Sequence, residues 1–323
     1  MKVALLGTGF GRAHAALYHR SPRVDEVVVF GRTPEKLARI AADHGFATTT
    51  DLDSVYADPD VDLVDVCLPV PLHAAHAVRA MEAGKHVLCE LPLAADLDEA
   101  RRVAEVREAT GRQAFVDMFA RFDPATEHLL AAVADGRHGE LRTLEFETRA
   151  ALLWPGATIG LDVMALEVLH SDLDVIVAAL GAPRSVTAAG VDAGDGRSAA
   201  EVLLDYPGRL VRCLGSSLNP VAFGMSGGFR ASFTGATLVR SFSGAPGHGM
   251  TGTLTEYTAQ GVRTVDLPGR DTYAAVIDHV LDCLEGRADN RISPASVLDG
   301  LKVTLDVHHA LTGGFTGSRR AAR

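Results

Sequence analysis

Short apolar runs that alternate with helix-type segments over the first 120 residues constrain the fold of this chain most strongly. These runs are apolar on both faces of the strand that each would form, so we expect them to be fully buried. Buried strands joined through helices form a parallel sheet that helices cover on both sides. The expected strands are 2–6, 26–30, 61–67, 85–89 and 113–118, and the expected helices are 12–20, 34–44, 72–83 and 96–110.

The second half of the sequence has a different pattern. A helix is expected over 161–180, and short strands separated by turn residues follow it. The turns "YPGR" and "FTGA" are typical of hairpins, which predicts a largely antiparallel sheet. The expected strands are 201–206, 209–218, 228–234, 236–242, 252–259 and 261–267, and helices near 271–285 and 294–312 close the chain.

These patterns predict an α/β protein with two domains, which a chain of 323 residues is long enough to form. Residues 1–120 are expected to form a doubly wound parallel sheet of Rossmann type. Residues 121–323 are expected to form an α+β domain with an open, largely antiparallel sheet. The last helices of that domain are free to pack back on the first one.

Composition narrows the class of partner. The formal net charge is −10 without a dense Lys/Arg run, which argues against nucleic acid and anionic membranes. No apolar run is long enough to span a bilayer, and "MKVALLG" is too short for a signal peptide. The four cysteines form no CxxC pair, and His/Cys spacing typical of a metal site is absent from the sequence. We therefore expect reduced thiols, no metal and a cytoplasmic location.

A glycine-rich turn follows the first strand in "VALLGTGFGRAHAAL". Such a turn, at the start of a helix, lets backbone amides approach the pyrophosphate of a dinucleotide. The third small residue is expected at position 12, where Arg12 stands, with Gly11 one place early. Either the helix starts one residue sooner, or Arg12 contacts the cofactor phosphates, or Arg12 is an exposed residue of the first turn. The candidate phosphate-binding residues are Gly7, Thr8, Gly9, Phe10, Gly11 and Arg12.

The end of the second strand predicts which nicotinamide cofactor binds. An acidic residue there would hold the ribose 2′-hydroxyl of NAD, whereas an arginine accommodates the 2′-phosphate of NADP. The sequence "VVVFGRTPEK" has no carboxylate at that point and offers Gly31, Arg32 and Thr33 instead. A guanidinium can pair with a phosphate through two hydrogen bonds. NADP is therefore favoured and NAD is the alternative, unless Arg32 is only a solvated loop residue.

The segments "GTGFGRAH", "VDLVDVCLPVPLHAAHAVRAMEAGKHVLCELPLA" and "ARFDPA" together resemble the Gfo/Idh/MocA family of NAD(P)-dependent oxidoreductases, over nearly the whole chain. The most specific part is 61–93, which is similar to the family's proline-to-histidine signature and to its strand-five signature "AGKHVLxEKP". The resemblance implies that Leu68, Pro69, His73 and Glu90 line the nicotinamide side of the cofactor, with Leu91 and Arg121 in the same cofactor-binding set. The alternatives are that His73 packs a helix start and that Glu90 pairs with a backbone amide.

Two usual catalytic groups of the family are replaced. Family members normally carry lysine where this chain has Leu91, and aspartate four residues before a histidine, where this chain has Leu166 before His170. Glu167, His170 and Asp174 fall at i, i+3 and i+7 of the expected helix, so they should line one helix stripe. A histidine flanked by carboxylates can act as a general acid near neutral pH, so these three are the candidate catalytic residues. The alternative is a polar stripe packed against the first domain or solvent.

The resemblance implies an NADP(H)-dependent reductase that acts on C=O, C=N or a conjugated C=C bond of a small metabolite, such as a modified sugar or a secondary-metabolite intermediate. An inactive NADP-binding regulatory or scaffold protein is the alternative, because both leucines remove catalytic groups. The resemblance also implies a homo-oligomer, a dimer or tetramer, formed through the open sheet. Trp154 is expected either to wall the substrate pocket or to anchor the core.

Overall fold

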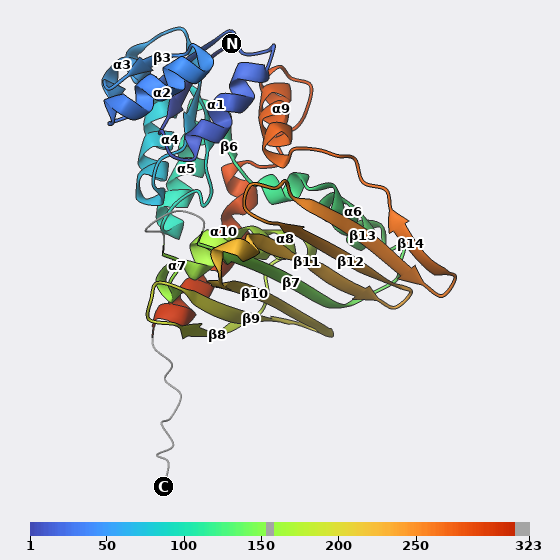
Figure 1. The fold of residues 1–323 in the computed structure, drawn as a ribbon. Coiled ribbons are helices and arrows are strands. Elements are labelled where there is room, and N and C mark those ends of the chain that lie inside the picture. The colour runs from blue at the N-terminus through green and yellow to red at the C-terminus, as the bar shows by residue number, and fades with distance from the viewer. Residues whose placement is uncertain (153–157, 314–323) are drawn as a thin grey trace. The chain divides into compact units, whose positions relative to one another are not determined.

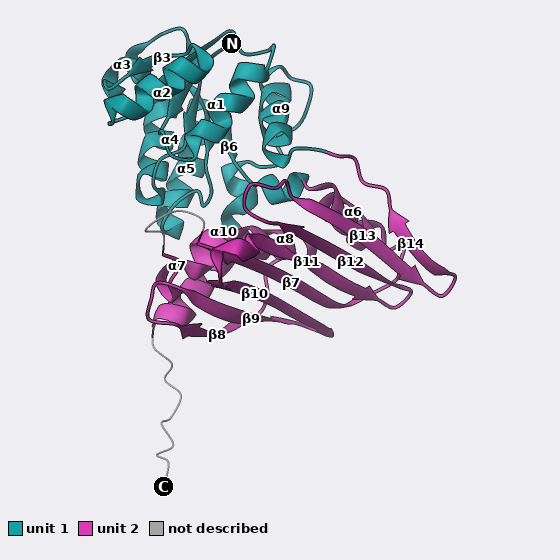
Figure 2. Cartoon of the chain, in the orientation of Figure 1, with its two compact units in different colours: residues 1–122, 270–298 teal, residues 123–269, 299–323 magenta. Residues whose placement is uncertain are grey.

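The structure is a computed structural model, and it describes residues 1–152 and 158–313. Trp154 lies outside the described residues. Figure 2 colours the two compact units into which the chain divides. Unit 1 comprises Met1–Phe122 and Arg270–Leu298, and unit 2 comprises residues 123–269 together with the described residues from 299 onward. A segment late in the sequence therefore belongs to the unit that the first third of the chain forms.

Unit 1 contains a six-stranded parallel sheet with the strand order β3-β2-β1-β4-β5-β6 (Figure 1). The order reverses between β1 and β4, and ligands of such sheets bind outside the carboxyl ends of the strands at that point. The strands are β1 (Lys2–Leu6), β2 (Glu26–Phe30), β3 (Ala47–Thr49), β4 (Val61–Val66), β5 (His86–Cys89) and β6 (Ala114–Val116). The helices are α1 (Gly11–Arg20), α2 (Pro34–His44), α3 (Leu52–Ala57), α4 (His73–Glu82), α5 (Leu97–Thr110) and α9 (Thr272–Leu284).

The parallel sheet is buried on both faces, as the apolar runs predicted. Val3, Ala4, Leu5 and Leu6 of β1 have no exposed surface. Because neither face of a strand meets water, its side chains need no polar alternation. The predicted α/β fold class is therefore confirmed for the first part of the chain.

The late segment of unit 1 runs along the outer edge of β6. The amide of Val116 donates to the carbonyl of Ile292 at 2.8 Å, and the Asn290 side-chain amide donates to the carbonyl of Ala114 at 2.9 Å. An uncovered sheet edge would present unpaired backbone groups to other chains. The segment that follows α9 thus completes the sheet edge in the place of a seventh strand.

Unit 2 contains an eight-stranded sheet with the order β14-β13-β12-β11-β7-β10-β9-β8. Every neighbouring pair is antiparallel except β7 with β10, which are parallel. The two predicted hairpins are confirmed as β9–β10 and β11–β12. The strands are β7 (Leu141–Ala151), β8 (Val186–Asp192), β9 (Ser198–Tyr206), β10 (Arg209–Asn219), β11 (Met225–Phe233), β12 (Ala236–Gly244), β13 (Thr251–Thr258) and β14 (Gly261–Val265).

Three elements of unit 2 were not predicted. They are the central strand β7, the edge strand β8 and the helix α6 (Pro124–Asp135). The remaining helices of this part are α7 (Leu161–Met164), α8 (His170–Leu180) and α10 (Pro294–Thr312), the last of which begins in unit 1. Across residues 1–152 and 158–313, no helix has the length and apolar character needed to cross a membrane.

Candidate functional site

The glycine-rich turn packs tightly against the end of β4. Gly7 has a φ of +115°, and a Cβ on it would lie 2.2 Å from the carbonyl oxygen of Cys67, so only glycine fits. The helix α1 begins at Gly11, one residue before the expected start. A Cβ on Gly11 would lie 3.3 Å from the Cβ of Cys67, so this glycine allows the close helix–strand packing that the third glycine of a dinucleotide turn provides. Arg12 is exposed on the first helical turn.

The turn leaves room for a pyrophosphate. Gly9 is exposed, and a Cβ on it would meet no atom within 4 Å among the residues that the structure describes. The start of α1 follows directly, and the N-terminal end of a helix favours a phosphate. A dinucleotide therefore fits this turn. Gly7 allows the turn to pack on Cys67, Gly9 leaves space for the phosphates, and Gly11 lets the helix approach the sheet.

The end of β2 lies beside the same turn. A Cβ on Gly31 would stand 2.6 Å from Cγ2 of Thr8, which shows how closely the two loops approach. Arg32 and Thr33 are exposed just before α2 begins at Pro34. The structure thus brings the predicted ribose-binding residues next to the predicted phosphate-binding turn.

His73 joins the loops that follow β4 and β5. Its Nδ1 lies 2.8 Å from the carbonyl oxygen of Pro92, and its Nε2 lies 2.6 Å from the carbonyl oxygen of Leu68. Carbonyl oxygens only accept, so both contacts are hydrogen bonds when the ring carries a proton on each nitrogen. The ring is 1% exposed, and Pro69 next to Leu68 is exposed. His73 therefore links the loop after β4 to the loop after β5.

Glu90 is partly buried at the end of β5. Its Oε2 accepts a hydrogen bond from the amide of Leu91 at 3.1 Å, and its Oε1 lies 3.2 Å from Nε2 of His14. Leu91, in the place of the family's lysine, is half-buried, and its peptide bond to Pro92 is cis. The backbone amide contact that the sequence offered as an alternative role for Glu90 is therefore present. Glu90 also belongs to a larger cluster of charged side chains.

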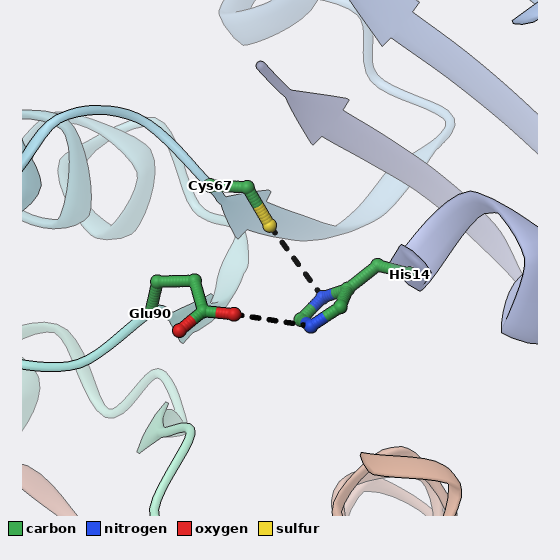
Figure 3. Close-up of side chains that lie close together, drawn as sticks. All are labelled: His14, Cys67 and Glu90. Carbon is green, nitrogen blue, oxygen red and sulfur yellow. Dashed lines mark hydrogen bonds and ion pairs between the residues drawn. The ribbon is translucent and has the colours of Figure 1, made fainter. Parts of the chain in front are cut away.

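His14 is the centre of that cluster, and Figure 3 shows its ring between Cys67 and Glu90. Its Nδ1 lies 2.7 Å from Oδ2 of Asp65, which also accepts from the Tyr18 hydroxyl at 2.7 Å. Its Nε2 lies 3.2 Å from Oδ2 of Asp117, as well as from Glu90. Helix α1 and the ends of β4, β5 and β6 therefore converge on one imidazole that has no exposed surface.

Burial and mutual charge set the protonation of this cluster. Burial tends to lower the pKa of His14, but Asp65 and the other acidic groups around the ring outweigh it and raise that pKa well above 6.5. Burial raises the pKa of Asp117 to about 7, with Glu90 adding to the effect and His14 opposing it. Asp117 is therefore the member of the cluster whose pKa lies close to neutral pH.

The three residues drawn in Figure 3 also offer donor atoms for a metal ion. Burial raises the pKa of the Cys67 thiol well above its usual range, so the sulfur keeps its proton. A metal binds the thiolate, and the Nδ1 of His14 is already bonded to Asp65. We therefore interpret this cluster as a proton-sharing group.

Sequence reasoning missed His14, Asp65 and Asp117. The available signal was a carboxylate inside an apolar strand, in "VDLVDV" and "AFVDM". Charged groups at buried positions are almost always paired, so two such carboxylates predict a buried partner. By contrast, Arg121 was predicted to bind cofactor, and the structure directs its guanidinium to the carbonyls of Arg291 and Ser296 at 3.0 and 2.9 Å.

The prediction of one regular helix over 161–180, with Glu167, His170 and Asp174 on a shared stripe, is wrong, whereas the catalytic role of these residues stays a prediction. A π-helical turn, Ala165–Leu169, separates α7 from α8. The wider turn changes the spacing that placed Glu167, His170 and Asp174 on one stripe. Glu167 is exposed, whereas His170 and Asp174 are 2% and 1% exposed. Asp172 accepts a hydrogen bond from the Thr148 hydroxyl at 2.7 Å, and burial raises its pKa to about 7.

The hydrogen bonds of Thr304 fix the tautomer of His170. The Thr304 hydroxyl donates to the carbonyl of Gly300 at 3.0 Å and lies 2.9 Å from Nδ1 of His170. A hydroxyl has one hydrogen, so Thr304 accepts from Nδ1–H of the ring. In the neutral ring the lone pair is then on Nε2.

Comparisons with known proteins relate the first domain of the chain to a known family. Residues 1–118 match the oxidoreductase family with an NAD-binding Rossmann fold, Gfo/Idh/MocA. A 4-carboxy-2-hydroxymuconate-6-semialdehyde dehydrogenase from Sphingobium sp. is 35% identical over 138 residues, which is 42% of this chain and 44% of the relative. An inositol 2-dehydrogenase from Rhizobium meliloti is 31% identical over 150 residues, 46% of this chain and 45% of the relative.

A solved structure resembles the fold over both units. The UDP-N-acetylglucosamine 3-dehydrogenase from Acidithiobacillus ferrooxidans has a TM-score of 0.79 and 25% identity, and the match covers 96% of this chain and 97% of that one. The sequence matches to the two curated dehydrogenases span less than half of their length. Residues 1–118 match the NAD-binding Rossmann domain of the Gfo/Idh/MocA family, in agreement with the family that the sequence motifs resemble.

The glycine turn leads to a stability prediction with a matched control. Gly7→Ala should lower the melting temperature by several degrees, because the new Cβ would overlap the carbonyl of Cys67 and the backbone would be held at a strained positive φ. Gly9→Ala meets open space and should melt within about 1 °C of the wild type. Thermal unfolding followed by circular dichroism measures both. Equal melting temperatures for the two variants would contradict the packing described for Gly7.

The buried carboxyl of Asp117 leads to a pH prediction. Its folded-state pKa of about 7 exceeds the ordinary value of 3.8, so its stabilising contribution is full below pH 4 and is lost as the pH rises through 7. Asp117→Asn removes that dependence. Relative to the wild type, the variant should gain about 1–3 kcal/mol of unfolding free energy between pH 5 and pH 8, measured by urea titration. Asp43→Asn changes an exposed residue of α2 and is the control; its unfolding free energy should depend on pH as that of the wild type does. If the unfolding free energy of Asp117→Asn showed the same pH dependence as the wild type, the shifted pKa would be refuted.

Proposed function

We propose that the protein is an NADP(H)-dependent oxidoreductase that transfers a hydride to or from a small polar metabolite. The proposal rests mainly on one observation: the glycine turn lies beside the end of β2, where Arg32 and Thr33 are exposed. The family match over 1–118 supports a nicotinamide dinucleotide at this turn.

The choice of NADP over NAD rests on charge at the end of β2. Position 31 is a glycine packed against Thr8, and Arg32 and Thr33 follow it without a carboxylate. A carboxylate would accept from a ribose 2′-hydroxyl but repel a 2′-phosphate. A guanidinium with a neighbouring hydroxyl attracts the phosphate and supplies donors to its oxygens.

The proposed substrate is a sugar-like or cyclitol-like molecule with a secondary hydroxyl or the corresponding ketone. The similar proteins named for inositol and for UDP-N-acetylglucosamine act, by their names, as dehydrogenases of such compounds. Reduction of a C=N or a conjugated C=C bond in a secondary-metabolite intermediate fits the same hydride chemistry. Those reactions place less demand on a proton donor, which suits a chain with Leu91.

Reduction of a ketone needs a proton at the oxygen as well as a hydride at the carbon. The bound reduced cofactor supplies the hydride. Leu91 has no ionisable group to supply the proton, and we assign that role to Nε2 of His170. In reduction, the doubly protonated ring gives up its Nε2 proton and is left as the neutral Nδ1–H tautomer, which the hydrogen bond to Thr304 stabilises. In the oxidative direction, the same nitrogen accepts the proton of the alcohol.

A second candidate function is an NADP-binding regulatory or scaffold protein. The leucines at positions 91 and 166 favour it, because each replaces a usual catalytic group of the family. Such a protein would bind NADPH normally and would show no turnover with any ketone, imine or enone. Binding and turnover therefore have to be measured separately.

Cofactor preference is tested by fluorescence titration of the protein with NADPH and NADH. We expect tighter binding of NADPH, and Arg32→Ala should weaken it about tenfold to a hundredfold, as expected for the loss of a charge-assisted contact. Arg20→Ala removes an equal charge at the other end of α1 and serves as the control. Equal affinity for both cofactors, or equal loss in both variants, would contradict the role of Arg32.

The role of His170 is tested by steady-state kinetics with NADPH. His170→Gln should lower turnover by roughly 10²–10⁴-fold while NADPH affinity changes little. Thr304→Val, which removes the acceptor for Nδ1–H, should shift the pH profile of turnover and reduce turnover less. His309→Gln, an exposed change on the same helix as Thr304, is the control. Unchanged turnover in a folded His170→Gln protein would rule out this histidine as the proton donor.

A further inference from the structure

Unit 2 contains a second cluster of donor atoms, apart from the residues discussed so far. It consists of His128 on α6, His138 in the loop after α6, and Glu256 on β13. One donor atom from each residue lies within 4.8 Å of the other two. The Nε2 atoms of His128 and His138 lie 3.8 and 3.5 Å from Oε2 of Glu256. These positions are 10 and 118 residues apart in sequence, so only the fold brings them together.

Both imidazoles leave a nitrogen unsatisfied. The Nε2 atoms of His128 and His138 are buried, and neither makes a hydrogen bond within the part of the chain that the structure describes. Leaving a buried polar atom without a partner costs about 1–3 kcal/mol. Two such atoms aimed at one carboxylate therefore point to a ligand between them. The side chains of His128, His138 and Glu256 are 17, 10 and 7% exposed, so the cluster is nearly enclosed.

The identity and spacing of the donors match zinc. Two histidines and one glutamate form a known three-residue zinc set, which leaves a fourth position for water or an anion. Ligands about 2.0–2.2 Å from a tetrahedral zinc ion lie roughly 3.3–3.5 Å from one another. The separations of 3.5 and 3.8 Å need only small side-chain shifts to meet that geometry. Soft thiolate ligands and hard all-oxygen sets, which suit other metals, do not occur in this cluster.

Arg263 is the group that competes with a cation. Its guanidinium donates to both oxygens of Glu256, at 3.0 Å to Oε2 and 3.3 Å to Oε1. The side chain is 63% exposed, so solvent screens this pair and the arginine can withdraw toward Oε1. An arginine on the second oxygen would then hold the carboxylate in place for the metal.

We propose that His128, His138 and Glu256 form a zinc-binding site that fastens strand β13 to helix α6. Strand β13 pairs with β12 on one side and with the short edge strand β14 on the other, and most of β14 is exposed. The outer end of the sheet therefore has little buried surface of its own. A metal link to α6 would stabilise that end of unit 2. The proposal differs from the sequence analysis, which predicted no metal.

The test uses the full chain after chelator treatment and dialysis, titrated with Co²⁺ and then Zn²⁺. We expect one equivalent of Co²⁺ to bind with the strong visible absorption of four-coordinate cobalt, and Zn²⁺ to displace it. Saturating Zn²⁺ should also raise the melting temperature. His138→Gln and Glu256→Gln should each weaken binding at least about a hundredfold. His248→Gln, an exposed histidine elsewhere in unit 2, should bind as the wild type does.

The Arg263→Ala variant tests whether Arg263 competes with the metal for Glu256 or whether Glu256 serves only as the partner of Arg263 in an ion pair. If the arginine only competes, this variant should bind Zn²⁺ as tightly as the wild type or more tightly. Circular dichroism and thermal unfolding of each metal-free variant report folding independently of metal binding, because the substituted residues all lie in unit 2. The proposal is overturned if no stoichiometric Co²⁺ or Zn²⁺ binding occurs. Binding that persists unchanged in folded His138→Gln and Glu256→Gln proteins would overturn it as well.

Discussion

The buried imidazole of His14 is the interaction on which the organisation of unit 1 depends. It lies on the inner side of α1 and meets carboxylates from β4, β5 and β6. Several uncompensated carboxylates in one apolar core would be prohibitively unfavourable, whereas a shared imidazolium offsets part of their charge. The ring can reach them only because α1 approaches the sheet closely at Gly7 and Gly11. The glycine turn and the charged cluster are therefore one arrangement, and each requires the other.

This arrangement also bears on the missing lysine. The family that the sequence motifs resemble normally carries lysine where this chain has Leu91, an apolar side chain. The carboxylate of Glu90 instead meets positive charge from His14 and a hydrogen bond from the backbone amide of Leu91. The loss of the lysine thus leaves Glu90 paired. The position can be occupied by leucine without leaving a buried charge uncompensated.

The sequence predicted those elements whose pattern is local. The buried parallel strands, their helices and both hairpins have clear apolar runs or turn residues, and their existence agrees with the structure. The strand β7 was missed because charged residues fill its outward positions, although Leu144, Phe146 and Thr148 mark the inward face at every second position. The helix α6 had a signal as well: Asp123 caps it and Pro124 opens it. The π-helical turn before His170 has no comparable local signal in the sequence, so the spacing rule for a regular helix failed there.

The strand order of unit 1 has a consequence for synthesis of the chain. The edge of β6 is covered by Asn290 and Ile292, which are made some 170 residues after the strand that they protect. During translation, the parallel sheet can form early, but its last strand keeps an open edge until nearly the whole of unit 2 has left the ribosome. An open edge is a template for pairing with other chains. The nascent nucleotide-binding unit is thus most exposed to misassembly while unit 2 is being made, and the interval ends when the late segment closes the sheet.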